Sequence, residues 1–169
     1  MAMMKNFVLD VDGVLAASPL FYTAEGKTMK VFGPDDHDAL NLLRDRMKIV
    51  FITGDKRGFP ISKRRVVDEM GFELHMVSTH ERVHWIGEHM GFPETIYMGD
   101  GIFDAPVFEK VGYSIAPSDS FYITRQKANF VTKCAGGNRA VAEACMHILE
   151  KFFNEKEITP NTKYGVWKK

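Results

Sequence analysis

Short apolar segments that end at Asp, Thr or Gly recur along this chain and alternate with amphipathic segments. Phe7–Leu9 runs into Asp10, Lys48–Thr53 into Gly54, and Thr95–Met98 into Gly99-Asp100. The intervening segments, such as Asp35–Met47 and Thr79–Met90, repeat their apolar residues at helical spacing. Alternating buried strands and helices predict an α/β fold, a Rossmann-like, doubly wound parallel sheet that is covered on both faces.

A β-hairpin is expected at about residues 18–33, early in a single domain that spans residues 1–153. Aromatic and β-branched residues of Leu20–Thr23 and Thr28–Phe32 flank a turn that contains Gly26. The remaining connections are too short for a separate lid, so we expect no cap domain. The last amphipathic helix is predicted over Asn138–Phe153, and residues 154–169 read as a polar C-terminal tail.

The composition argues against several kinds of partner. The 169 residues include 22 Lys and Arg against 22 Asp and Glu, so a bulk charge gives no reason to expect nucleic acid or an anionic membrane as partner. Cys134 and Cys145 stand apart and predict reduced thiols. The N-terminal apolar run is too short for a signal peptide or a membrane span. We therefore expect a cytoplasmic protein.

The strand ends carry the candidate catalytic residues. Ligands of such sheets bind beyond the carboxyl ends of the strands, where Asp10, Asp12, Thr53 and Asp100 should meet. Phosphoryl transfer needs a nucleophile, an acid for the leaving oxygen and a cation for the phosphate charge. Asp10 suits the nucleophile and Asp12 the acid and base. Taken alone, the DVDG segment is equally consistent with a simple turn at a strand end.

Two further motifs complete the predicted site. The Thr53 hydroxyl and the backbone N–H groups around Gly13 and Gly54 can hold phosphate oxygens, although Thr-Gly is also ordinary turn chemistry. Asp100 can join Asp10 around one Mg²⁺, with Asp104 as a further ligand or support; either could instead cap a helix. Three such motifs in this order, each after a buried strand, favour the catalytic interpretation.

The set DVDGV, ITG and MGDGIFD resembles the haloacid dehalogenase superfamily of phosphohydrolases over nearly the whole chain. The nearest pattern is its capless group, which contains 3-deoxy-manno-octulosonate 8-phosphate phosphatases and sialic-type 9-phosphate phosphatases. Supporting segments are the hairpin, Lys63-Arg64-Arg65, Ser120–Ile123 and Ala135-Gly136-Gly137.

The resemblance implies roles and partners. Asp10 would form an aspartyl-phosphate, Asp12 would act as acid and base, and Thr53 would bind phosphate. Mg²⁺ would lie on Asp10, the Asp12 carbonyl and Asp100. It also implies a homotetramer in which hairpins pack together, and a tail, Tyr164–Trp167, that covers an adjacent site.

The sequence departs from the family pattern in two places. The usual lysine near the start of the Thr79–Met90 helix is missing, and Arg82 is the nearest replacement, with His80 and Lys63 as weaker candidates. The arginine that follows the hairpin in octulosonate phosphatases is also missing, and Asp55 resembles an acidic residue of some sialic-type enzymes. We take this as weak evidence against the octulosonate substrate; Asp55 could equally be a loop carboxylate. Lys63 could meet a substrate carboxylate or be a solvated charge.

The sequence therefore predicts a Mg²⁺-dependent phosphohydrolase that cleaves a phosphate monoester of a small metabolite, an acid sugar phosphate. Two alternatives remain open at this point. The missing lysine suits a non-catalytic or weakly active binding or regulatory protein, and the missing cap suits a phosphatase of a macromolecular substrate.

Overall fold

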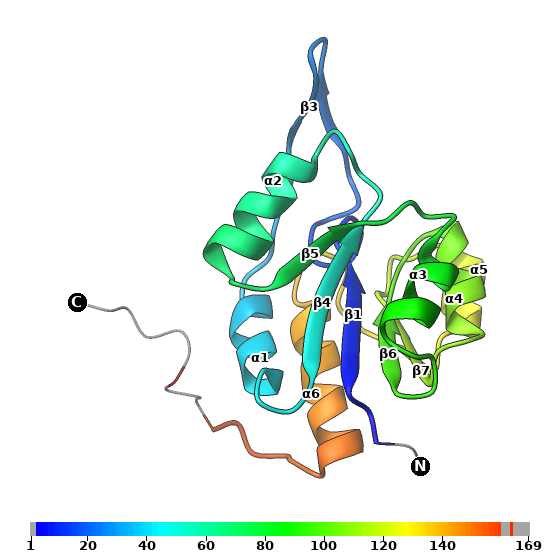
Figure 1. The fold of residues 1–169 in the computed structure, drawn as a ribbon. Coiled ribbons are helices and arrows are strands. Elements are labelled where there is room, and N and C mark those ends of the chain that lie inside the picture. The colour runs from blue at the N-terminus through cyan, green and yellow to red at the C-terminus, as the bar shows by residue number, and fades with distance from the viewer. Residues whose placement is uncertain (1–2, 160–162, 164–169) are drawn as a thin grey trace.

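A six-stranded parallel sheet forms the centre of the computed structural model, which describes residues 3–159 and 163. The strand order is β5-β4-β1-β6-β7-β8, and every pairing within this sheet is parallel. Figure 1 labels the first five of these strands. The predicted α/β doubly wound fold is confirmed. The strands are β1 Asn6–Asp10, β4 Lys48–Thr53, β5 Glu73–Met76, β6 Thr95–Met98, β7 Tyr113–Ala116 and β8 Phe130–Val131.

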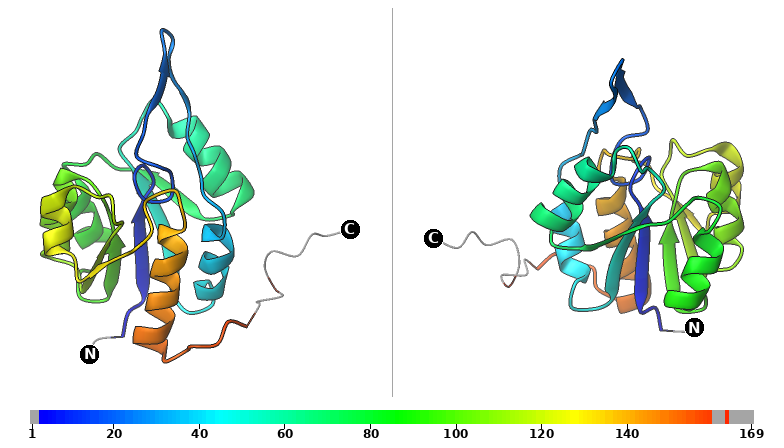
Figure 2. Two further views of the ribbon diagram at one scale, coloured as in Figure 1. Left: turned by 180° about the vertical axis from the view of Figure 1, so that it is seen from behind. Right: turned by 45° about the horizontal axis from the view of Figure 1, so that its top comes forward.

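Two hydrophobic clusters bury the two faces of the sheet. Alternate residues of β1 divide between them: Phe7 and Leu9 belong to one cluster and Val8 to the other. The first cluster packs against α1 (Asp36–Leu43), the π-helical turn η1 (Arg64–Glu69) that continues α2 (Phe59–Lys63), and α6 (Ala140–Phe153). The second packs against α3 (Arg82–His89) and α4 (Ala105–Phe108), and the two helical layers are visible in Figure 2.

The strand order creates a switch point at β1. The chain passes from β1 to β4 and β5 on one side, and then returns to β6 on the other side of β1. Crevices at such points lie outside the carboxyl ends of the strands. Asp10, Thr53 and Asp100 lie at or shortly after the ends of β1, β4 and β6.

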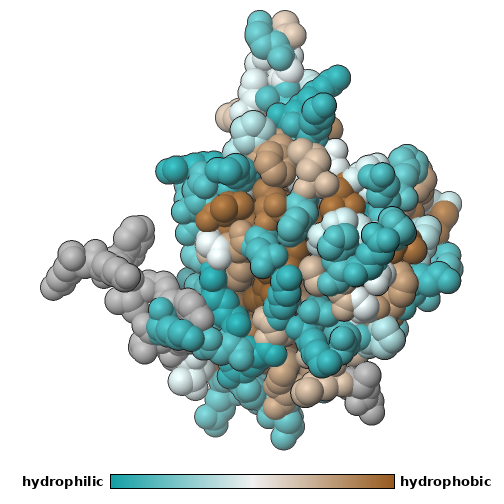
Figure 3. All heavy atoms as spheres, in the orientation of Figure 1, coloured by the Kyte–Doolittle hydropathy of each residue, from teal (hydrophilic) through white to brown (hydrophobic). Residues whose placement is uncertain are grey.

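A two-stranded hairpin, β2 (Phe21–Thr23) and β3 (Gly26–Met29), projects beyond this edge of the sheet (Figures 1 and 2). Its apolar side chains are largely exposed, and Figure 3 shows apolar surface near its base; the exposed residues are Leu20, Phe21, Tyr22, Met29 and Val31. No cap domain is present in residues 3–159, as expected.

Several predicted boundaries differ from the structure. The helix expected over Asp35–Met47 ends at Leu43, and the one expected from Thr79 begins at Arg82. The chain first makes a turn in which the Glu81 N–H donates to the Ser78 carbonyl, and the His80 ring packs against Phe103. This turn places Arg82 at the start of α3, where its side chain can reach the strand ends.

The C-terminal tail contains no helix or strand in its described part, residues 154–159 and 163. The predicted role of Tyr164–Trp167 concerns residues outside the described part of the chain. No helix among the described residues has the length and apolar character that a membrane span requires.

Candidate active site

Three aspartates converge at the carboxyl edge of the sheet. Asp10 ends β1 and Asp100 follows the neighbouring β6, while Asp104 lies in the short helix η2 (Ile102–Asp104). Each offers a carboxylate oxygen, and these three oxygens lie within 4.8 Å of one another. The Oδ1 of Asp10 accepts a hydrogen bond of 2.7 Å from the Val11 N–H, which fixes the carboxylate at the strand end.

Asp104 is held by donors on both of its oxygens. Its Oδ2 accepts the N–H groups of Asp100 and Gly101, each at 2.9 Å, and its Oδ1 accepts the hydroxyl of Tyr97 at 2.6 Å. The carboxylate is fully buried. These contacts indicate that Asp104 supports the site by orienting the loop that carries Asp100.

Arg82 supplies the positive charge of this group. Its Nη1 lies 2.6 Å from Asp10 Oδ2 and 2.5 Å from Asp104 Oδ1, and donates to the Tyr97 hydroxyl at 3.0 Å. The residue is only 3% exposed. Its buried Nε has no hydrogen-bond partner among the described residues. His80, the alternative candidate, packs on Phe103 at the surface of the site.

The carboxylates of the group crowd negative charge into a buried space. Burial and the nearby Asp104 together raise the pKa of Asp10 to about 7, although Arg82 opposes the rise. Burial and the charges of Asp10 and Asp104 raise the pKa of Asp100 to about 8. One guanidinium cannot balance three ionised carboxylates. An oxygen-liganded divalent cation fits this donor set, because it would neutralise the excess charge and restore the ionised forms.

Gly13 gives the Asp100 carboxylate the space it occupies. The backbone φ of Gly13 is +82°, and a Cβ at this position would lie 2.0 Å from Asp100 Oδ2. Only glycine combines this conformation with this close approach. The turn after β1 therefore brings backbone against a carboxylate from the loop after β6.

Asp12 and Thr53 form the other half of the site. The hydroxyl of Thr53 donates to Asp12 Oδ2 at 3.3 Å and accepts the Asp55 N–H at 3.1 Å. Two hairpin lysines face the same carboxylate: Lys30 Nζ lies 2.9 Å from Asp12 Oδ1, and Lys27 Nζ lies 3.7 Å from it. Gly54 follows Thr53 and is exposed beside them.

The structure brings Asp55 to this half of the site but not Lys63. Asp55 Oδ2 pairs with Lys27 at 2.5 Å and with Lys30 at 2.9 Å. Lys63 instead pairs with Asp68 at 3.2 Å and lines a surface groove with Val67, Phe72 and Leu74, next to the edge strand β5. The predicted binding of phosphate by Lys63 has no support in this geometry.

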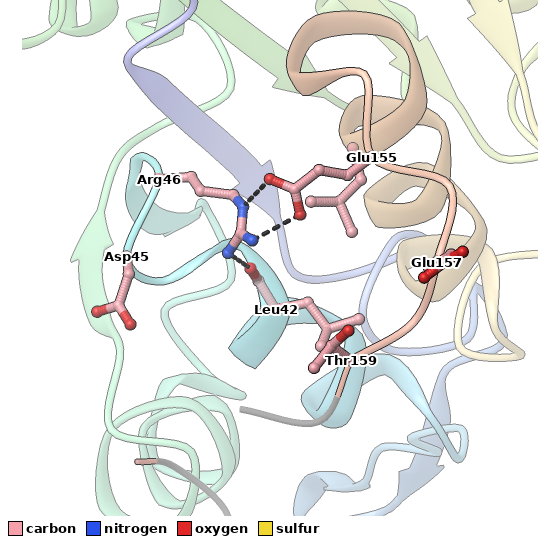
Figure 4. Close-up of a pocket in the computed structure, with 7 residues that line it drawn as sticks. Leu42, Asp45, Arg46, Glu155, Glu157 and Thr159 are labelled. Carbon is pink, nitrogen blue, oxygen red and sulfur yellow. Dashed lines mark hydrogen bonds and ion pairs between the residues drawn. The ribbon is translucent and has the colours of Figure 1, made fainter. Parts of the chain in front are cut away.

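A separate cavity lies at the opposite edge of the sheet (Figure 4). It is lined by Leu42, Asp45, Arg46, Leu149, Glu155, Glu157 and Thr159. The guanidinium of Arg46 donates to both carboxylate oxygens of Glu155, at 2.8 and 2.6 Å. Because Arg46 closely precedes the first residue of β4, this cavity is remote from the strand ends that carry the aspartates.

Comparison with known proteins identifies the family, although no family model matches the chain. The 3-deoxy-D-manno-octulosonate 8-phosphate phosphatase KdsC of Escherichia coli K12 is 31% identical over 150 residues, and the match covers 86% of this chain and 79% of that protein. The chain belongs to the KdsC-like phosphatase family of the haloacid dehalogenase superfamily. The predicted enzyme class, a phosphoric monoester hydrolase, is thereby confirmed.

Solved KdsC-like structures share the fold. The cobalt-bound phosphatase of Haemophilus influenzae superposes with a TM-score of 0.78 at 26% identity and covers 89% of this chain and 90% of its own. The phosphatase of Moraxella catarrhalis, in complex with magnesium, phosphate and KDO, superposes with a TM-score of 0.74 at 24% identity over 89% of this chain and 90% of its own. The second likeness supports the fold alone.

Three residues of this KdsC-like site were not predicted from the sequence. Tyr97 lies within an apolar strand and reads as core, although its hydroxyl contacts both Arg82 and Asp104. Lys27 and Lys30 read as polar hairpin residues, whereas their side chains are almost completely buried. The available signal for the two lysines was their spacing, three residues apart in a hairpin that also carries aromatic residues.

Proposed function

We propose that this KdsC-like protein hydrolyses the phosphate monoester of an acid sugar through an aspartyl-phosphate on Asp10. The observation that supports this most strongly is the convergence of Asp10, Asp100 and Asp104 within 4.8 Å, with Arg82 against two of them. A buried carboxylate held between an N–H and a guanidinium, at the mouth of a parallel sheet, is suited to in-line attack on phosphorus.

In the first step, an Asp10 oxygen attacks phosphorus and the bond from phosphorus to the leaving oxygen breaks. Asp12 donates its proton to that oxygen, which leaves as an alcohol. In the second step, the ionised Asp12 takes a proton from water as the water oxygen attacks phosphorus. The aspartyl bond then breaks, inorganic phosphate leaves, and Asp10 and Asp12 return to their starting states.

Thr53, Arg82 and the backbone at Gly13 and Gly54 are the proposed phosphate ligands. Arg82 takes the position that a lysine has in the family pattern, and its planar guanidinium offers donors to both the nucleophile and a phosphate oxygen. Asp10, the Asp12 carbonyl and Asp100 would hold Mg²⁺, with Asp104 supporting Asp100. Bound there, the cation would neutralise charge on the phosphate and on the nucleophile.

The acid sugar class is proposed because the curated relatives are named for 3-deoxy-D-manno-octulosonate 8-phosphate. Asp55 is not proposed as a direct substrate ligand, since two lysines already neutralise it. A homotetramer, with the exposed apolar hairpin residues at the contact, remains a prediction that gel filtration with light scattering would test.

The proposed function is tested by phosphate release from a panel of sugar phosphates, nucleotides and p-nitrophenyl phosphate, with Mg²⁺ and with EDTA. We expect turnover that needs both Mg²⁺ and Asp10, with an acid sugar phosphate as the best substrate. Turnover that survives Asp10→Asn would refute the role of Asp10. Metal and phosphate binding without any turnover would favour the non-catalytic alternative.

A further inference from the structure

The ammonium group of Lys30 is enclosed by acceptors beside the active site. Its Nζ lies 2.9 Å from both oxygens of Asp12, 2.8 Å from the Ser62 hydroxyl and 2.9 Å from Asp55 Oδ2. The side chain is 3% exposed. Three N–H donors therefore have three partners, and a lysine so completely engaged has little freedom to change its orientation.

A second ion pair lies behind Lys30. Lys27 Nζ contacts Asp55 Oδ2 at 2.5 Å, and Asp55 Oδ1 accepts the Gly58 N–H at 3.0 Å. Although burial opposes it, hydrogen bonds from Lys27, Gly58 and Lys30 lower the pKa of Asp55 to about 2. Asp55 thus stays ionised and pairs with both lysines.

The loop after β4 is shaped to this cluster. A Cβ on Gly58 would lie 2.1 Å from Asp55 Oδ2, 2.7 Å from Lys30 Cε and 2.9 Å from Lys27 Cδ. The backbone at residue 58 therefore comes as close to the lysines as a residue without a side chain permits. The hairpin, this loop and the first motif are joined through buried charges rather than through apolar packing.

Without Lys30, the Asp12 carboxylate would keep only long contacts to side chains among the described residues. These are the Thr53 hydroxyl at 3.3 Å and Lys27 at 3.7 Å. Asp12 lies in the loop after β1, and a carboxylate there can rotate about two side-chain bonds. Efficient proton transfer requires that rotation to be restricted.

We propose that Lys30 is a positioning residue that fixes the Asp12 carboxylate for proton transfer to the leaving oxygen. The Lys27–Asp55 pair holds Lys30 in place, so the hairpin determines the geometry of the acid. This inference rests on the proposed function, in which Asp12 is the acid. Both lysines are almost completely buried and already contact carboxylates, which disfavours the other reading, in which they bind a substrate carboxylate directly.

The test compares two substrates whose leaving groups differ in their need for an acid. An alkyl monoester, such as the best sugar phosphate of the panel, needs protonation of its leaving oxygen, whereas p-nitrophenyl phosphate releases a stable anion. We expect Lys30→Met to lower kcat/KM, which reports the steps up to release of the leaving group, at least about tenfold on the alkyl ester and less than about threefold on p-nitrophenyl phosphate. Lys30→Arg should recover part of the loss.

A double-mutant cycle then shows whether Lys30 acts through Asp12. In an Asp12→Ala background, Lys30→Met should cause no further loss on the alkyl ester. Lys48→Met is the matched control, because this half-exposed lysine lies at the far end of β4 and pairs with Glu73. Thermal unfolding of every variant checks that the fold is retained.

The outcomes separate the two proposals. Equal losses of kcat/KM on both substrates, or additive losses with Asp12→Ala, would overturn the positioning role and leave the proposed function standing. A large rise in KM for acid sugars alone would overturn it as well, in favour of a substrate subsite. A wild-type protein that releases no phosphate from either ester would overturn the proposed function and this role together.

Discussion

The Nη1 atom of Arg82 lies 2.6 Å from the Oδ2 of Asp10, in a pair that is almost completely buried. The same nitrogen also contacts Asp104 and Tyr97. A residue at the first turn of α3 thus joins the end of β1 to the loop after β6. This contact holds together the half of the site that carries the nucleophile.

Replacement of Arg82 should lower activity, and more severely when the whole guanidinium charge is removed. Arg82→Ala removes a buried charge beside two carboxylates, and we expect kcat/KM to fall by about a hundredfold or more. Arg82→Lys keeps a point charge but not the planar fork, and we expect a smaller decrease of about tenfold. Arg46→Ala is the matched control, since it removes an arginine–carboxylate pair at the remote cavity of Figure 4. Full activity of Arg82→Ala in steady-state kinetics would contradict a role for Arg82 in the site.

Stabilisation by Mg²⁺ should increase with pH. The pKa values of Asp10 and Asp100 are raised to about 7 and about 8, so the metal-free folded protein binds more protons than the unfolded chain between about pH 4 and about pH 8. The stability that these bound protons contribute is lost as the pH rises through the pKa values of the folded protein. Bound Mg²⁺ can take the place of the protons and preserve the stability of the folded protein at high pH. The difference in Tm between Mg²⁺ and EDTA should therefore be small at about pH 5 and large at about pH 8.5.

Two variants identify the source of this pH effect. Asp100→Asn should abolish the Mg²⁺-dependent difference in Tm. Asp36→Asn should preserve it, because Asp36 is a buried aspartate whose pKa burial raises to about 6, but it accepts the Ala142 N–H in α6, away from the site. A Mg²⁺ effect that is independent of pH would argue against these carboxylates as ligands.

Gly13→Ala should weaken metal binding. The new methyl group would meet the Asp100 carboxylate at 2.0 Å, so Asp100 or the turn after β1 must move. Gly26→Ala is a matched control in the hairpin, where φ is +124° but no atom lies within 4 Å of the added Cβ. Both variants should lose about 1 kcal/mol or more of stability from backbone strain. Isothermal titration with Mg²⁺ should show a loss of about tenfold or more for Gly13→Ala only.

Tyr97→Phe should reduce turnover although the Tyr97 side chain is fully buried. The variant keeps the ring but removes the hydroxyl that donates to Asp104 and accepts from Arg82. We expect a loss of about 1–3 kcal/mol in stability and a decrease in kcat. Tyr113→Phe removes a comparable hydroxyl contact, to His147, and should affect stability without affecting kcat. Equal kinetics in the two variants would contradict a role for Tyr97 in the site.

The sequence predicted the residues whose placement follows from strand ends. Asp10, Thr53 and Asp100 end or closely follow apolar strands, and parallel pairing brings such ends to one edge whatever the details of the loops. The fold class was predictable for the same reason. Arg82 was predicted as the replacement for lysine, although residues 79–81, which belong to the turn before it, were predicted as helix.

Tertiary contacts decided the rest. The burial of Lys27 and Lys30 depends on how the hairpin leans over the loop at Gly58, and a charged residue carries no local signal of burial. Lys63 pairs with Asp68, five residues on, at the start of a segment that winds as a π-helix, and no feature of the sequence indicated this winding. The contacts of the Tyr97 hydroxyl with Arg82 and Asp104 could not be predicted, because Tyr97 lies within an apolar strand.

The central claim is a covalent phosphoryl group on Asp10, and rapid acid quenching tests it most directly. Asp12→Asn, mixed with Mg²⁺ and p-nitrophenyl phosphate, should form the aspartyl-phosphate but hydrolyse it slowly, because the base that activates water is missing. Peptide mass spectrometry of the quenched protein should find the phosphoryl group on Asp10. It should find no phosphoryl group when EDTA replaces Mg²⁺, or in the double variant that carries both Asp12→Asn and Asp10→Asn. A phosphoryl group on another residue, or turnover without any phosphorylated protein while Asp10→Asn stays active, would contradict the account.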